Sequence, residues 1–142
     1  MDLLSRRVIG CNLSSRVTSE AVMDALLMAI WRRQLKPPVL VHSDQGAQYT
    51  SRDWLDFLKE HRMEVSMSRR GNCHDNAVAE SFFFSMKLER IKKNIYASRD
   101  EVRLDLVQYI EGYYNYRCRH SNNGGLSPKQ FEDNFFRKLD SV

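Results

Sequence analysis

The sequence has no long apolar run and only three cysteines. Its longest apolar stretch, Ala25 to Trp31, is far too short to span a bilayer, and the first residues lack the layout of a signal peptide. We therefore expect a cytoplasmic protein with no membrane partner. Cys11, Cys73 and Cys118 are odd in number and far apart, so they suggest neither a disulfide framework nor a zinc site. Reduced thiols are the simpler interpretation.

The composition is that of an ordinary soluble domain. Charged residues make up 28% and hydrophobic residues 42% of the 142 residues, which argues against disorder. Lys and Arg outnumber Asp and Glu by 22 to 18. The basic residues gather in clusters whereas the acids are dispersed, and this distribution indicates a polyanionic partner.

Strand and helix patterns alternate in the first half of the chain. Thr18 can cap a helix in which Val22, Leu26 and Ala29 repeat at helical spacing. We expect this helix to be buried on more than one face, because Trp31 and other residues add apolar surface on its other sides. The expected elements are a strand at 7–13, a helix at about 18–33, a strand at 39–42, a helix opened by a capping box at 50–53, and a strand at 64–67. This alternation predicts an α/β fold, in which helices cover a sheet.

Helices are expected to dominate the second half, as extra C-terminal helices. The first runs from Asn76 to about Ile91, and a second capping box, Ser98-x-x-Glu101, opens the next. Residues 122–128 read as a loop and residues 129–136 as a short helical turn. The core faces are expected to consist of Ala79, Phe82, Phe83 and Met86 in the first helix, and of Val102, Leu106, Tyr109, Ile110 and Tyr113 in the second.

Two acids lie in contexts that suit a functional carboxylate. Asp44 follows the strand predicted at 39–42, Glu80 lies near the start of the helix predicted from Asn76, and 35 residues separate them. Carboxylates at a strand end and on a nearby helix can hold two Mg²⁺ ions for phosphoryl transfer, because Mg²⁺ prefers oxygen ligands. Each acid alone also has a simpler interpretation, Asp44 as a turn residue and Glu80 as a solvated helix residue.

Basic residues flank Glu80 on both sides and predict contacts with a DNA backbone. Lys87 lies about two helical turns beyond Glu80 on the same face, where it could hold a phosphate. Such contacts give affinity that depends strongly on salt and little on base sequence. An ordinary solvated helix face explains the same residues without DNA. The predicted DNA-binding residues of this region are Arg69, Arg70, Lys87, Arg90, Lys92 and Lys93.

A cluster of tyrosines and arginines lies between residues 113 and 120. Its rings can stack on bases, and Arg117 and Arg119 can contact a phosphate backbone. The alternative is a tyrosine-rich helix end that packs on the core. His42 and His74 lie close to the two acids in sequence, but histidine is a poor first choice for Mg²⁺, so we expect both to support the ligands at most.

Taken together, these motifs resemble the integrase core of the DDE transposases encoded by bacterial insertion sequences, the OrfB type related to retroviral integrases. The spacing of Asp44 and Glu80 is the family's own, and Lys87 falls where those transposases place a basic residue. The resemblance covers nearly the whole chain and rests on several motifs in order. The matching stretches are residues 2–10, His42 to Tyr49, Ser66 to Glu80, Tyr113 to His120, and the closing motif Leu126 to Phe131.

The resemblance implies an RNase H-like fold with a mixed sheet, and cleavage and strand transfer of DNA ends that depend on Mg²⁺ or Mn²⁺. Asp44 and Glu80 then take the second and third positions of an acidic catalytic triad and bind the metal. Arg69 to Asp75 corresponds to the loop before the catalytic helix. We accordingly expect a partial catalytic core at residues 1–121 and a C-terminal extension at residues 122–142.

In that family the first catalytic Asp lies upstream of the segment that resembles Met1 to Gly10, so the sequence matches two of the three acids and lacks the first strand or strands of the sheet. With two carboxylates we expect weak metal binding, and weak or no activity of the chain alone. A missing strand also exposes backbone edges, which predicts a homo-oligomer or a rearranged sheet. One alternative is a non-catalytic module that binds DNA or dimerises and regulates a full-length transposase. Another is an RNase H-like nuclease that acts on RNA.

Overall fold

The computed structural model describes residues 1–33, 37–68, 76–139 and 141, and it divides into two compact units. The strand unit comprises residues Ile9–Val78. The helical unit comprises Met1–Val8 together with Ala79–Val142. Within the described ranges, no helix combines the length and the apolar character needed to cross a membrane.

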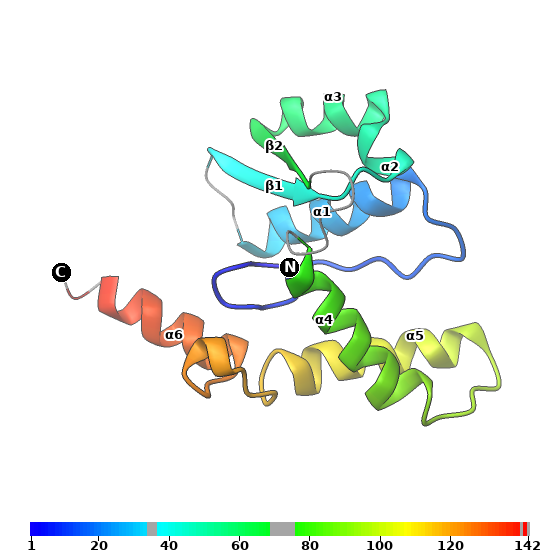
Figure 1. Ribbon diagram of the computed structural model, residues 1–142, viewed down its shortest axis with the longest axis vertical. Coiled ribbons are helices and arrows are strands. Elements are labelled where there is room, and N and C mark those ends of the chain that lie inside the picture. The colour runs from blue at the N-terminus through cyan, green and yellow to red at the C-terminus, as the bar shows by residue number, and fades with distance from the viewer. Residues whose placement is uncertain (34–36, 69–75, 140, 142) are drawn as a thin grey trace. The chain divides into compact units, whose positions relative to one another are not determined.

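The sheet of the strand unit is a parallel pair of strands. Strand β1 (Val39–Ser43) pairs with β2 (Met63–Met67), and the register runs from Val39 opposite Met63 to Ser43 opposite Met67. Parallel neighbours need a crossover connection, and here it contains the helices α2 (Ala47–Thr50) and α3 (Arg52–Glu60). Figure 1 shows both strands running in the same direction, with α3 above them and α1 (Ser19–Arg33) below them in that view. The strands predicted at 39–42 and 64–67 are confirmed.

The strand unit has one small core, which is formed mainly by α3 and β2. Trp54 and Leu58 of α3 and Met63 of β2 are buried in it, and they are 2%, 0% and 9% exposed. The cap that begins α3 is Ser51, whose hydroxyl accepts a hydrogen bond from the Trp54 backbone N–H at 3.3 Å. The capping box was expected one residue earlier. The partly buried residues around this core are Val22, Met23, Leu26 and Ile30 of α1, with Val39, Val41 and Tyr49.

Helix α1 confirms the helix predicted at about 18–33, but the prediction that it is buried on more than one face was wrong. Ala29 is its one buried residue, whereas Trp31 is 78% exposed and Leu27 is exposed as well. In the described residues, one side of α1 packs on the core, its backbone at Ala25 and Ala29 lies against Gly10, and the side that carries Leu27 and Trp31 is exposed.

The strand predicted at 7–13 was also wrong, because this segment pairs with no strand in the described part of the chain. The amide of Asn115 provides bonds that a neighbouring strand would otherwise make. Its Oδ1 accepts from the Val8 N–H at 2.9 Å, and its Nδ2 donates to the Val8 carbonyl at 3.0 Å. Farther along, the backbone of Gly10 packs directly against α1. A strand pattern without a partner therefore remains extended chain that binds side chains and helix backbone.

The helical unit is built from three α-helices and two π-helical turns in the described residues. Its elements are α4 (Ala77–Met86), the π-turn η1 (Lys87–Ile91), α5 (Arg99–Gln108), the π-turn η2 (Tyr109–Tyr114), the 3₁₀ turn η3 (Ser121–Asn123) and α6 (Pro128–Leu139). The predicted capping box is confirmed, because the Ser98 hydroxyl accepts from the Glu101 N–H at 3.2 Å and the Glu101 carboxylate accepts from the Ala97 N–H at 2.7 Å. Helix α6 is longer than the short turn expected at 129–136.

The π-turn η2 changes which tyrosine enters the core. Tyr109 and Tyr114, five residues apart, are 2% and 4% exposed, whereas Tyr113, expected in the core, is exposed. A π-turn contains more residues than an α-turn, so the position after Tyr113 is rotated inward. The Tyr114 ring meets the Phe82 ring of α4 edge-on at 4.7 Å between centroids. Phe83 was likewise expected in the core and is exposed.

A buried polar cluster joins the first eight residues to the end of the chain. Glu132 of α6 is 4% exposed, and its carboxylate accepts from the Ser5 hydroxyl at 2.6 Å and from the Arg7 guanidinium at 2.8 Å. The Asn123 side chain donates to the Ser5 carbonyl at 2.8 Å. Residues of 122–142 are therefore bonded to Met1–Val8 within one unit. The division into 1–121 and 122–142 stays a prediction.

Buried tyrosines should make the helical unit less stable as the pH rises above 10. Burial and, second, the hydrogen bond that Tyr109 donates to Glu89 at 2.8 Å raise the pKa of Tyr109 above its ordinary value of 10.0, and burial raises the pKa of Tyr114 to about 12. Below pH 10 these phenols are neutral in the folded and unfolded states. Above pH 10 the unfolded phenols ionise first, so the free energy of unfolding should fall as the pH rises from 10 to 12. Urea unfolding across this range should show the decline, and an equally steep decline in Tyr114→Phe would contradict the role of Tyr114.

Candidate functional site

Asp44 lies on an exposed turn directly after β1, as the sequence predicts. Its Oδ1 accepts a hydrogen bond from the Gly46 N–H at 2.8 Å, an arrangement in which an aspartate side chain stabilises its own turn. Among the described residues, its second oxygen has no hydrogen-bond partner. The turn role and the metal-ligand role are therefore compatible, because one oxygen supports the turn while the other stays available.

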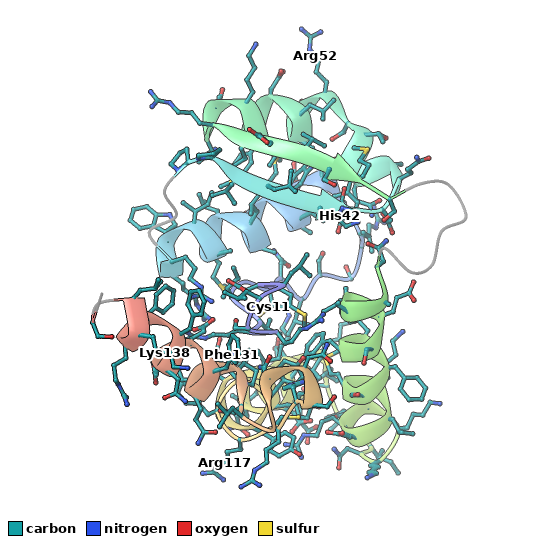
Figure 2. The ribbon with its side chains drawn as sticks, turned by 60° about the vertical axis from the view of Figure 1, so that its left-hand side comes forward. Cys11, His42, Arg52, Arg117, Phe131 and Lys138 are labelled. Atoms are coloured by element: carbon teal, nitrogen blue, oxygen red, sulfur yellow. The ribbon has the colours of Figure 1, made fainter. Side chains whose placement is uncertain are left out.

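The strand ends beside Asp44 are tied together by side chains of β1 and β2. The two ring nitrogens of His42 lie 2.9 Å from the Ser66 hydroxyl and 3.0 Å from the Ser68 hydroxyl. Figure 2 shows His42 at the carboxyl end of β1, beside the end of β2. Both ring nitrogens are thus occupied by serines, which agrees with the prediction that this histidine supports a ligand at most. Sequence reasoning missed the two serines, although the parallel register that places Ser66 opposite His42 contains the signal.

Tyr49 lies close enough to Asp44 for the carboxylate charge to affect the pKa of its phenol. Burial is the larger cause that raises the pKa of this phenol, and the Asp44 carboxylate is the second. The Tyr49 N–H donates to the Gly46 carbonyl at 2.9 Å, and its ring meets the Trp54 ring edge-on at 5.5 Å. Tyr49 therefore links the turn that carries Asp44 to the core of the strand unit, a role that the sequence alone did not indicate.

Glu80 lies in the first turn of α4, and its side chain is exposed. The partial positive charge of a helix N-terminus favours a carboxylate at this position. Glu80 belongs to the helical unit and Asp44 to the strand unit. In the described ranges, no three His, Cys, Asp or Glu side chains gather into a metal-binding group.

The donor chemistry of both acids fits a hard divalent cation. Each presents exposed carboxylate oxygen, which Mg²⁺ and Mn²⁺ prefer, and exposure leaves room for the waters that Mg²⁺ keeps. Softer metals would require sulfur or imidazole ligands. The His42 imidazole is already bonded to serines, and Cys73 and His74 lie outside the described residues.

Apart from Arg90, the predicted DNA-binding residues fall into three groups. Lys87, the first residue of η1, and Lys92 and Lys93 just after it are exposed. Arg117 and Arg119 are exposed beyond η2, and Figure 2 shows Arg117 pointing away from the helices of its unit. Arg69 and Arg70 lie outside the described residues. Among the described residues, the exposed members of this set are therefore lysines at the start of η1 and just after it, and arginines after η2.

Arg90 is different because it already has partners within the helical unit. Its guanidinium lies 2.8 Å from the Asp105 carboxylate and 5.9 Å from the centroid of the Tyr109 ring. The Tyr96 hydroxyl donates to the same Asp105 carboxylate at 2.7 Å. A DNA phosphate would have to compete with this ion pair, so DNA binding by Arg90 remains a prediction and would require the pair to open.

The tyrosine cluster at 113–116 divides between its two interpretations. Tyr114 packs in the core, which confirms the structural alternative for that residue. Tyr113 and Tyr116 are 44% and 48% exposed, so base stacking remains a prediction for them. The division follows from η2, which turns one ring of three inward.

Two family models match most of the chain. Residues 1–73 match a model described as integrase core domain, and residues 61–128 match a second model of the same description. Together they include Asp44, Glu80 and Lys87. The two matches together cover residues of both units.

Transposases of insertion sequences are similar to this chain. Transposase InsF for insertion sequence IS3A of Escherichia coli (strain K12) is 49% identical over 133 residues, which cover 94% of this chain and 46% of the relative. The transposase for insertion sequence element IS904 of Lactococcus lactis is 39% identical over 93% of this chain and 52% of the relative. The chain thus spans about half the length of these relatives.

Solved structures agree with the fold. A chain of the simian T-cell lymphotropic virus intasome has a TM-score of 0.65 at 16% identity and covers 83% of this chain and 41% of its own length. The catalytic core domain of BIV integrase has a TM-score of 0.58 at 19% identity, over 89% of this chain and 78% of its own. At these identities the likeness shows the fold, and it confirms the RNase H-like integrase core predicted from the sequence. The chain belongs to the integrase core domain family, and transposases of bacterial insertion sequences are among its relatives.

Proposed function

We propose that this chain forms the part of a transposase that binds metal and DNA while the ends of an insertion sequence are cleaved and joined to target DNA. The observation that carries the proposal is the setting of Asp44, an exposed acid with an available oxygen on a turn fixed at the carboxyl end of β1. Glu80, exposed in the first turn of α4, is the second acid of the proposed site. The named relatives are transposases, which supports the same reaction class.

Asp44 and Glu80 would hold Mg²⁺ or Mn²⁺. A bound metal supplies polarisation of a phosphate oxygen and a more acidic water. The chain contributes the two carboxylates, and it holds Asp44 in place through the Gly46 N–H. Because two acids match the family's three, and ligand number sets affinity for hard cations, we expect weak metal binding and weak or no strand transfer by the chain alone.

DNA would be held by the exposed cations. Lys87, Lys92 and Lys93 belong to the turn and loop that follow α4, and Arg117 and Arg119 lie beyond η2. Contacts of this kind neutralise phosphates and position a duplex without reading its bases. Arg69 and Arg70, which lie outside the described residues, are included in this proposal on the basis of the sequence alone. Arg90 would contact DNA only when its ion pair with Asp105 opens.

We further propose that the chain associates with copies of itself. In the described residues the sheet has two strands, so each strand presents one edge of main-chain N–H and C=O groups that pairs with no other strand. Exposed edges of this kind favour pairing with another chain.

The catalytic proposal is tested with Mn²⁺ and pre-cleaved DNA of an insertion-sequence end. The wild-type chain is expected to give a low yield of strand-transfer product, and Asp44→Asn and Glu80→Gln should give none. The matched control is Glu60→Gln, which changes an exposed acid at the end of α3 and should keep the product. DNA retention without product from any variant would favour the non-catalytic DNA-binding alternative. A chain that neither retains DNA nor forms product would refute the proposed function.

A further inference from the structure

We infer that Ser68 is a positioning residue for Asp44, because it bonds to the chain on both sides of that acid. The inference rests on the proposed function in one respect, namely that Asp44 is the acid that binds metal. Ser68 follows directly after β2 and is 4% exposed. Asp44 itself is exposed and takes part in none of the hydrogen bonds of Ser68. Ser68 would therefore act on Asp44 through its neighbours in the sequence.

The bonds that precede Asp44 extend the sheet by one residue. The Ser68 N–H donates to the Ser43 carbonyl at 2.9 Å, which continues the parallel pairing beyond its last partners, Ser43 and Met67. The Ser68 hydroxyl lies 3.4 Å from the same carbonyl and 3.0 Å from the His42 Nε2. The main chain immediately before Asp44 is therefore held by both the backbone and the side chain of Ser68.

The bond that follows Asp44 comes from Gln45. Its side-chain Nε2 donates to the Ser68 carbonyl at 3.2 Å. Ser68 thus forms hydrogen bonds through its N–H, its hydroxyl and its carbonyl. Their partners are His42, Ser43 and Gln45, which flank Asp44 in the sequence. We call this set of four residues the Ser68 hub.

The hub matters because an exposed turn is otherwise free to change conformation. Fixing the backbone of a residue costs conformational entropy, and a metal ligand that is already fixed does not incur that cost on binding. Among the described residues, Asp44 makes one hydrogen bond of its own, which it accepts from the Gly46 N–H. The hub supplies the remaining constraint, and His42 completes it by joining the Ser68 hydroxyl to Ser66.

Hydrogen exchange of the Gly46 amide reports the position of Asp44 directly, because this N–H donates to the Asp44 carboxylate. Ser68→Ala removes the hydroxyl contacts, and Gln45→Ala, at an exposed side chain, removes the contact after Asp44. Losing one such bond should speed Gly46 exchange roughly 3- to 10-fold relative to the Leu58 amide, which reports opening of the whole unit. In the control Ile30→Val, a core change in the same unit, both rates should rise together. Parallel changes at Gly46 and Leu58 in Ser68→Ala and Gln45→Ala would overturn the inference.

Paramagnetic broadening of the Gly46 resonance by Mn²⁺ separates this inference from the proposed function. The wild-type chain should show broadening, and Ser68→Ala should need roughly 3- to 10-fold more Mn²⁺ for the same effect. An unchanged Mn²⁺ requirement in Ser68→Ala would overturn the positioning role. Wild-type chain without any broadening would refute the metal role of Asp44, and the exchange rates would then decide alone whether Ser68 positions that residue.

Discussion

Gly10→Ala is expected to unfold the strand unit under conditions in which the wild-type chain is folded. A Cβ at position 10 would overlap the backbone carbonyl oxygen of Ala25 and lie 3.0 Å from the backbone nitrogen of Ala29, both within α1. Backbone atoms of a helix cannot rotate away as the end of a side chain can, so either the segment or the helix must move. Overpacking costs typically about 1–3 kcal/mol and more where nothing yields, and we expect a loss of at least about 3 kcal/mol.

The measurement is urea unfolding followed by the fluorescence of Trp54, which lies in the core of the strand unit. Gly112→Ala is the matched control, because a Cβ at that position meets no atom within 4 Å. Because Gly112 lies in η2 of the helical unit, this control should leave the unfolding transition reported by Trp54 unchanged. Equal unfolding midpoints for Gly10→Ala and the wild type would show that Gly10 does not lie against α1 in solution.

Glu132→Ala is expected to have the second-largest effect, this time on the helical unit. The substitution leaves the Arg7 guanidinium and the Ser5 hydroxyl without the carboxylate that both contact. Removing one partner of a buried ion pair costs about 3–5 kcal/mol, and because the Arg7 side chain is 22% exposed and can recover some hydration, we expect about 2–3 kcal/mol.

The neighbouring acid provides the control for this change. Asp133 is exposed and pairs with Lys129 one helical turn away, an arrangement worth about 0.3–0.5 kcal/mol. Asp133→Ala should therefore change the free energy of unfolding by less than about 1 kcal/mol. Near-ultraviolet circular dichroism of the buried tyrosines monitors the unit, and similar losses in the two variants would refute the buried cluster.

Local signals predicted most of the helices and strands. The pair Ser98 and Glu101 fixes the start of α5 through bonds between residues three or four apart, and such bonds depend on nothing distant. The segment 7–13 failed for the opposite reason, because a strand exists only where another strand accepts its bonds. The prediction that Tyr113 is buried was wrong because it assumed an α-helical period through η2. The periodicity of the sequence does not indicate a π-turn.

The candidate site was predictable in its residue types and less so in its support. Asp44 was placed correctly at a strand end, and Glu80 at the start of a helix, because turn and helix chemistry are local. The hub around Ser68 was not predicted, since it requires the register of two strands that are separated by α2 and α3. The sequence alone does not distinguish Arg90 from the other basic residues, because its ion pair with Asp105 joins two separate helices.

The bonds from Ser5 and Arg7 to Glu132 join residues 127 and 125 positions apart, and this separation sets an order of folding during synthesis. The strand unit is one continuous stretch, Ile9–Val78, and it can fold as soon as that stretch has left the ribosome. Residues 1–8 are made before the strand unit, yet their partners on α6 are made after it. The segment that precedes the strand unit therefore reaches its final place only after α6 has been made.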